Sequence, residues 1–351
     1  MIRALVVDDS HFMRTVISDI LEDGGIEVVD QGANGREAVR LVEEHDPDVV
    51  TMDVEMPEMN GIEAVETIME RHPVPIMMLS ALTTDGADAT LEALDKGAVD
   101  AFAKPGGTIT TDMSSHDEEL VSRVEAVANA DPTARPPTTR ESGTTTTSPA
   151  DASGEEYLDD PTLVIGASTG GPNVVEAVLA SLPGEADFRV LVVQHMPDAF
   201  TARFAKRLDA KSAYEVREAT DGERIGGGEA LVAKGNHHLV VSGYSNGRLR
   251  VKLEQSDPVH SVRPAIDVTM ESVAERVHDP ITGVLLTGMG ADGSAGAVAI
   301  DEAGGSVLVQ DEETSAVFGI PARAIETGCV DAVLPEEEIV DGILDTVRSD
   351  T

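Results

Sequence analysis

The stretch LVIGASTGG, residues 163–171, has the pattern of a strand, a tight turn and the start of a helix. Its apolar run at residues 163–165 suits a buried strand, and apolar side chains from residue 174 onward recur at helical spacing. Glycines on both sides of Ser168 allow a sharp backbone turn, and nearby helix-terminal N–H groups can stabilise negative charge. We therefore expect Ser168 to be a hydrolase nucleophile at a strand end.

The rest of residues 159–351 also alternates between strand-like and helix-like segments. The longer strand-like runs are residues 162–165, 189–193, 281–286 and 306–309. A middle stretch has turn pairs at Gly235-Asn236 and Asn246-Gly247, which are typical of hairpins, between apolar runs at residues 230–233, 239–241 and 249–253. The pattern predicts an α/β domain with a mainly parallel sheet and an antiparallel hairpin insertion.

A nucleophilic serine needs a base within hydrogen-bond reach, and the base needs an orienting partner. His195 ends the apolar run of residues 191–194, so we expect it at the same sheet edge as Ser168. Asp292 follows a third strand and the loop TGMG, residues 287–290, and reaches that edge too. The sequence therefore predicts a Ser168, His195 and Asp292 triad.

The other polar residues near these segments have simpler interpretations. Four more histidines follow Ser168 and are interpreted as surface or structural residues: His237, His238, His260 and His278. Arg263 and Asp267 could contact substrate, but a salt-bridged helix start is the simpler interpretation.

There are four other interpretations of the same pattern. GASTGG contains the GxSxG of α/β-hydrolases, but that family places its acid before its histidine, whereas here the order is Ser168, His195, Asp292. A dinucleotide loop would need GxGxxG spacing, which is missing. Two further alternatives for the second half are a non-catalytic binding module, in which GASTGG serves only packing, and a DNA-binding domain. Residues 159–351 carry 32 acidic against 15 basic residues, which disfavours phosphate contacts.

In the first half, five apolar runs alternate with helical patterns and predict a doubly wound (βα)5 domain over residues 1–128. One helical pattern, Phe12, Val16, Ile17, Ile20 and Leu21, is expected to form a single buried stripe. The strand runs are residues 4–7, 28–29, 49–52, 76–79 and 99–102.

Polar residues follow the ends of these strands: Asp8, Asp9, Asp53, Ser80 and Lys104. Ligands bind at this edge of such sheets. Three converging carboxylates repel one another unless a cation joins them, and oxygen-only ligation favours Mg²⁺. Lys104 would then pair with an added phosphoryl group.

Composition limits the remaining possibilities. Residues 129–158 are polar and rich in Pro and Thr, and we interpret them as a flexible linker. The net charge of −40 is spread over both halves and only six of the 25 basic residues are Lys, which is typical of a protein from a salt-loving organism. The single cysteine, Cys329, excludes an intrachain disulfide, and no apolar segment approaches a membrane span. We expect a cytoplasmic protein that is not itself a membrane protein and does not bind nucleic acid.

The first half resembles the receiver domain of two-component response regulators. VVDDS (residues 6–10), MDVEMPEMNG (52–61), LSA (79–81) and AKP (103–105) carry the resemblance. It implies that Asp53 accepts a phosphoryl group from a chemotaxis histidine kinase. It also implies that Asp9, Asp53 and the backbone carbonyl of Glu55 hold Mg²⁺, with Asp8 in support, and that Ser80 and Phe102 respond to the phosphate.

The second half resembles the catalytic domain of chemotaxis protein-glutamate methylesterases over nearly all of residues 159–351. IGASTGGP (165–172), VVQHMP (192–197), VRPAIDV (262–268), LLTGMGADG (285–293) and VFGIPARA (317–324) carry the resemblance. It implies demethylation of glutamate γ-methyl esters, and deamidation of selected glutamines, on methyl-accepting chemoreceptors. The same match makes Ser168 the nucleophile, His195 the base and Asp292 its orienting acid, with Thr169 and the N–H of Met289 at the substrate or oxyanion. No metal or other cofactor is expected for ester hydrolysis.

Overall fold

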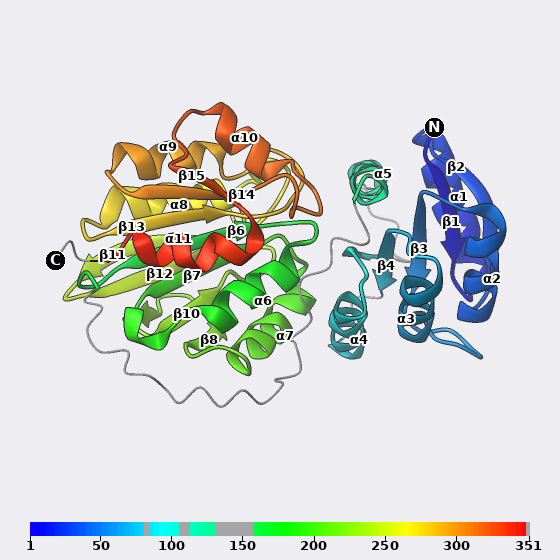
Figure 1. Ribbon diagram of the computed structural model, residues 1–351, viewed down its shortest axis with the longest axis horizontal. Coiled ribbons are helices and arrows are strands. Elements are labelled where there is room, and N and C mark those ends of the chain that lie inside the picture. Colours follow the sequence, from blue (N-terminus) through cyan, green and yellow to red (C-terminus); the bar gives the residue numbers. More distant parts are fainter. Residues whose placement is uncertain (81–83, 105–112, 131–156, 349–351) are drawn as a thin grey trace. The chain divides into compact units, whose positions relative to one another are not determined.

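The structure is a computed structural model that describes residues 1–80, 84–104, 113–130 and 157–348. It divides into two compact units, residues 1–134 and 135–351, and each has its own sheet (Figure 1). Most of the expected linker, residues 131–156, lies outside the described residues. The boundaries expected at residues 128 and 159 therefore stay predictions.

The N-terminal unit is a parallel five-stranded sheet in the order β2-β1-β3-β4-β5. Its strands are β1 (Arg3–Val7), β2 (Glu27–Gly32), β3 (Val49–Asp53), β4 (Ile76–Ser80) and β5 (Asp100–Ala103). Its helices are α1 (His11–Asp23), α2 (Gly35–His45), α3 (Gly61–Arg71), α4 (Thr84–Asp95) and α5 (Met113–Ala128). Helix α1 packs with α5, and α3 packs with both α2 and α4, as in a doubly wound domain. The predicted five-fold βα alternation is confirmed.

Helix α1 departs from prediction at one residue. Ile17 and Leu21 are fully buried in the core, but 72% of Phe12 is exposed. At about 100° of rotation per residue, Phe12 lies about 140° around the helix from Ile17 and opposite Leu21. Met13, four residues before Ile17, packs against the core instead. Including Phe12 in the buried stripe was therefore wrong.

The C-terminal unit has a parallel seven-stranded sheet in the order β15-β14-β13-β6-β7-β10-β8. Its strands are β6 (Thr162–Ala167), β7 (Arg189–Gln194), β8 (Glu215–Glu218), β10 (Glu229–Val232), β13 (Ile281–Leu285), β14 (Ser306–Gln310) and β15 (Ala332–Leu334). A second, antiparallel sheet contains β11 (His238–Ser245), β12 (Arg248–Glu254) and β9 (Arg224–Ile225). The predicted mainly parallel sheet with an antiparallel insertion is confirmed.

Only one of the two predicted hairpins forms among the described strands. Strands β11 and β12 are joined by Asn246-Gly247, both with left-handed backbone. Strand β10 was expected to pair with β11, but it lies between β7 and β8 and is parallel to both. Residues 230–232 are fully buried, as is usual inside a parallel sheet, and a short apolar run of this kind fits either pairing. The chain reverses at Gly235-Asn236 to enter the other sheet.

Helices cover the seven-stranded sheet on both faces (Figure 1). They are α6 (Gly171–Ser181), α7 (Asp198–Asp209) and α11 (Ile339–Asp345) on one face, and α8 (Ile266–Arg276), α9 (Ser294–Glu302) and α10 (Ile320–Glu326) on the other. Strand β6 is central, and the chain passes from it to β7 on one side and later to β13 on the other. Open α/β sheets bind ligands where the strand order reverses in this way. None of the helices described in this chain is both long and apolar enough to cross a membrane.

A short 3-10 helix, η2 (Glu336–Glu338), places one carboxyl in an unfavourable position. Burial, with a contribution from the charge of Glu337, raises the pKa of Glu336 to about 7. Below about pH 4.5 this carboxyl is protonated in both folded and unfolded chains, whereas above pH 7 the folded chain must bury a charge. The stability of the C-terminal unit is therefore expected to fall between these two pH values.

Glu336→Gln removes that penalty and should stabilise the C-terminal unit at pH 8 by about 1–2 kcal/mol, but not at pH 4. The gain stays in this range because the side chain is only partly buried, so solvent screens its charge. Denaturant unfolding in molar salt at both pH values measures the difference. Glu338→Gln, an exposed change in the same helix, is the control for simple loss of negative charge. An equal gain at pH 4 would contradict the expectation.

Candidate active site

Ser168 immediately follows β6 and precedes α6 in a turn closed by its own backbone. Its N–H donates to the carbonyl of Thr287 (3.0 Å), and its carbonyl accepts from the N–H of Gly171 (2.9 Å). Only 5% of Ser168 is exposed. The residue is therefore at the carboxyl end of the sheet strands, as predicted, and is largely shielded from water.

Two glycines are required by this geometry, one in the turn itself and one in a neighbouring loop. Gly170 has a φ of +76°, a left-handed conformation that side chains with a Cβ seldom adopt. In the neighbouring TGMG loop, a Cβ on Gly288 would lie 2.7 Å from the Cβ of Ser168. The loop can therefore approach the serine only because residue 288 has no side chain.

His195 follows β7 directly and lies beside the serine turn. Its N–H donates to the carbonyl of Ala167 (3.0 Å), and its ring Nε2 lies 2.8 Å from Oδ2 of Asp292. The adjacent Gln194 is buried, and its Nε2 donates to the carbonyls of Ser168 (2.8 Å) and His195 (3.3 Å). This link between the two strand ends was not predicted, although Gln194 stands in the VVQHMP motif.

Asp292 comes from the loop between β13 and α9 and is almost fully buried. Its Oδ2 also accepts from the N–H of Ile266 (2.7 Å), and its Oδ1 accepts from the N–H of Asp267 (2.9 Å). Burial alone would raise the pKa of Asp292, but the hydrogen bonds from His195 and from these two N–H groups lower it below its usual value. Asp292 is therefore held as a carboxylate facing His195.

The N-terminal residues of α8 are arranged differently from the prediction. Asp267 does not form a salt bridge with Arg263 in this part of the chain. Its Oδ1 accepts from the N–H groups of Gly293 (2.8 Å) and Gly296 (2.7 Å), whereas Arg263 binds Asn236 and the carbonyl of Ser256. The expected salt bridge was wrong because the N-terminus of α9 provides a closer set of donors for Asp267.

The two residues matched to substrate or oxyanion binding lie on the loops next to Ser168. Thr169 is buried, and its carbonyl accepts from the hydroxyl of Thr287 (3.0 Å). Met289 follows Gly288, whose carbonyl accepts from the N–H groups of both Gly319 (3.0 Å) and Ile320 (2.7 Å). These bonds fix the TGMG loop against the VFGIPARA segment, and the N–H of Met289 is on this fixed loop.

The N-terminal unit has a second polar cluster at the carboxyl ends of β1, β3 and β5. Nζ of Lys104 lies 2.7 Å from Oδ2 of Asp8 and 2.8 Å from Oδ2 of Asp53. Asp9 is exposed, but one of its carboxylate oxygens is within 4.8 Å of those of Asp8 and Asp53. The three carboxylates are hard oxygen donors, which fits Mg²⁺.

Burial and the neighbouring charges shift the pKa values of two groups in this cluster. Burial raises the pKa of Asp53, an effect increased by Asp8 and opposed by Lys104. Burial would lower the pKa of Lys104, but its hydrogen bonds to Asp53 and Asp8 raise it above its usual value. Lys104 is therefore a fixed positive charge beside Asp53.

The remaining receiver residues lie around this cluster. Ser80 ends β4 and is buried, and Phe102 is buried in the core with the guanidinium of Arg123 5.7 Å from its ring centre. Glu55 is exposed two residues after Asp53, and the resemblance assigns its backbone carbonyl to the metal.

Comparison with known proteins identifies both domains. Residues 163–343 match the family described as CheB methylesterase, and residues 4–110 match the response regulator receiver domain. A protein-glutamate methylesterase/protein-glutamine glutaminase from Halobacterium salinarum is 65% identical over 351 residues, covering 100% of both chains. One from Haloarcula marismortui is 56% identical over 363 residues, covering 99% of this chain and 98% of the relative.

A solved structure gives the same result for the second half. The crystal structure of the Thermotoga maritima CheB methylesterase catalytic domain has 41% identity and a TM-score of 0.50, and the match covers 52% of this chain and 97% of that domain. The two relatives named above come from halophiles, in agreement with the acidic composition. The chain belongs to the CheB methylesterase family and carries a response regulator receiver domain at its N-terminus.

Proposed function

We propose that this protein hydrolyses glutamate γ-methyl esters, and deamidates selected glutamines, on methyl-accepting chemoreceptors. Ser168, His195 and Asp292 form the catalytic triad. The observation that carries the proposal is the 2.8 Å hydrogen bond between His195 and a buried, ionised Asp292. His195 follows β7 and Asp292 lies in the loop after β13, and these two strands flank β6, which Ser168 follows. The names and full-length similarity of the relatives support the substrate class.

The reaction follows from the proton positions available. His195 takes the Ser168 proton as Oγ attacks the ester carbonyl, and then returns it to the leaving methanol, or to ammonia from a glutamine. Water then attacks the glutamyl-enzyme, again with His195 as base, and releases glutamate. The N–H of Met289 and the backbone at Thr169 are proposed to stabilise the oxyanion.

The ring orientation of His195 decides which nitrogen acts as base. Nε2 is bound to Asp292, so Nδ1 is the nitrogen left to accept the proton of Ser168. In chymotrypsin the two nitrogens have the opposite roles. This assignment supports an independently arranged triad rather than an α/β-hydrolase site.

The receiver domain is proposed to control this activity through phosphorylation of Asp53 by a chemotaxis histidine kinase. Asp9, Asp53 and the carbonyl of Glu55, supported by Asp8, would hold Mg²⁺, which supplies positive charge against the phosphoryl oxygens. Lys104, now paired with Asp8 and Asp53, is placed to bind a phosphoryl group added to Asp53. The single cysteine is consistent with action in the reducing cytoplasm.

Asp53→Asn should abolish phosphorylation and leave methanol release at its basal rate. With an acyl phosphate and Mg²⁺ in molar salt, the unchanged protein should accelerate at least about fivefold, the lower range of typical coupling between sites. Phosphate incorporation and methanol release from methylated receptor membranes measure the two effects. Asp19→Asn, an exposed change in α1, is the matched control and should respond like the unchanged protein. Equal acceleration of the Asp53→Asn protein would refute control through Asp53.

A further inference from the structure

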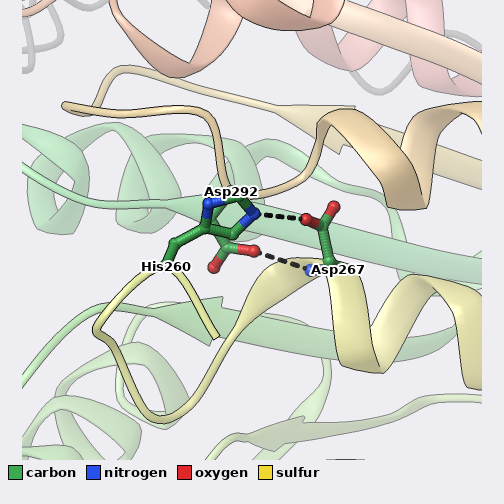
Figure 2. Close-up of side chains that lie close together, drawn as sticks. All are labelled: His260, Asp267 and Asp292. Carbon is green, nitrogen blue, oxygen red and sulfur yellow. Dashed lines mark hydrogen bonds and ion pairs between the residues drawn. The ribbon is translucent and has the colours of Figure 1, made fainter. Parts of the chain in front are cut away.

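The carboxylate of Asp292 belongs to a larger cluster at the start of α8. Figure 2 shows the ring of His260 and the carboxylate of Asp292 both directed toward Asp267. Nε2 of His260 lies 2.8 Å from Oδ2 of Asp267. Ligand atoms of all three residues are within 4.8 Å of one another. His260 is thus one residue removed from the triad acid.

Asp267 fixes Asp292 through two hydrogen bonds, one to the carboxylate of Asp292 and one to the backbone of the next residue. Its own N–H donates to Oδ1 of Asp292 (2.9 Å), while its Oδ1 accepts from the N–H of Gly293, the residue that follows Asp292 (2.8 Å). The side chain of Asp292, which precedes α9, therefore caps the N-terminus of α8. The side chain of Asp267, in α8, in turn caps the N-terminus of α9. With Oδ1 used in this way, His260 supplies the donor for the other oxygen of Asp267.

The backbone around His260 is strained in the conformation that makes this contact. His260 and Ser261 have φ values of 51° and 63°, both left-handed, in a tight turn closed by hydrogen bonds between Val259 and Val262. Such paired positions favour Asn and Gly, and other residues there carry an energetic cost. The sequence thus has a residue with a side chain in a left-handed conformation where the imidazole reaches Asp267.

A cation is a poor occupant for this cluster. Oδ2 of Asp292 already accepts from His195 and Ile266, and Oδ1 of Asp267 accepts from two helix N–H groups. A metal ion on these oxygens would have to displace donors that hold the triad and the two helix ends.

We propose that His260 is a positioning residue for the triad. It fixes Asp267, and Asp267 fixes the carboxylate that orients His195. The proposal rests on the proposed function, since it assigns a role within that triad. His260 acts on the chemical step, so its loss should lower kcat rather than raise KM.

His260→Gly in the full-length protein tests this role, because Gly relieves the left-handed backbone while removing the ring. Methanol release from methylated receptor membranes in molar salt should show a kcat lowered about tenfold and a KM within about twofold of the unchanged protein. Since 41% of the His260 side chain is exposed, added imidazole can reach the vacated position and should restore most of the lost rate. Ser261→Gly, which relaxes the same turn but keeps the ring, is the matched control and should match the unchanged protein with and without imidazole.

Three results would overturn the inference: an unchanged kcat, a raised KM with the same kcat, or a lowered kcat that imidazole does not restore. The last would mean that His260 only supports the fold. Failure of the proposed function would differ, because methanol release would then survive Ser168→Ala.

Discussion

Methanol release from methylated receptor membranes is expected to fall by about 10³-fold or more when Ser168 is replaced by alanine. Alanine leaves no oxygen to form the glutamyl-enzyme, so only the oxyanion groups and bound water remain. The fold should be unaffected, because the hydrogen bonds of residue 168 to Thr287, Gly171 and Gln194 all use its backbone. The change therefore separates chemistry from structure.

The control for this result is Ser242→Ala, an exposed serine on β11 that should keep full activity. Ammonia release from unprocessed receptor should fall in parallel with methanol release, since both reactions need the same nucleophile. Full methanol release by the Ser168→Ala protein would refute the triad and favour a binding role for this domain.

Asp292→Asn is expected to lower kcat by about 10³- to 10⁴-fold, because an amide neither orients His195 correctly nor balances its positive charge. Asp292 uses both oxygens as acceptors, with His195 and Ile266 on one and Asp267 on the other. Asparagine has one oxygen, so its NH₂ group must face a donor on one side. Steady-state kinetics on methylated receptor in molar salt measure the loss.

The same substitution should also change how the free energy of unfolding depends on pH in the acid range. The pKa of Asp292 is below its usual value when folded, so its carboxylate adds stability above the unfolded pKa of about 3.9. That contribution disappears as the pH falls through the lower, folded pKa. Asp301→Asn, an exposed change on α9, is the control and should keep both activity and acid stability. Retained kcat in the Asp292→Asn protein would contradict the assigned role.

Much of the fold was predictable because buried parallel strands can be recognised from their local sequence. Short apolar runs bounded by turn residues located β6, β7, β13 and β14, and the residues directly after them placed Ser168 and His195 correctly at one edge. Such strand ends converge by topology alone, so no knowledge of side-chain packing was needed. The receiver sheet was predictable for the same reason.

The misses depended on contacts between segments distant in sequence. The partners of β10 are chosen by a fully buried sheet, and an apolar run of four residues fits a hairpin equally well. Asp267 was expected to form a salt bridge with Arg263, because its actual partners, Gly293, Gly296 and Asp292, are brought near only when α8 and α9 meet. Sequence spacing does not show which helix start faces which.

The exchange of caps between α8 and α9 makes the two helix starts a single cooperative unit. If α8 frays at its first turn, Asp292 loses two of its three donors and α9 loses its cap in the same event. We therefore expect any partly opened state of these helix starts to release Asp292 from its orientation. Local unfolding of the α8 and α9 N-termini should therefore stop the reaction, even while the rest of the sheet remains folded.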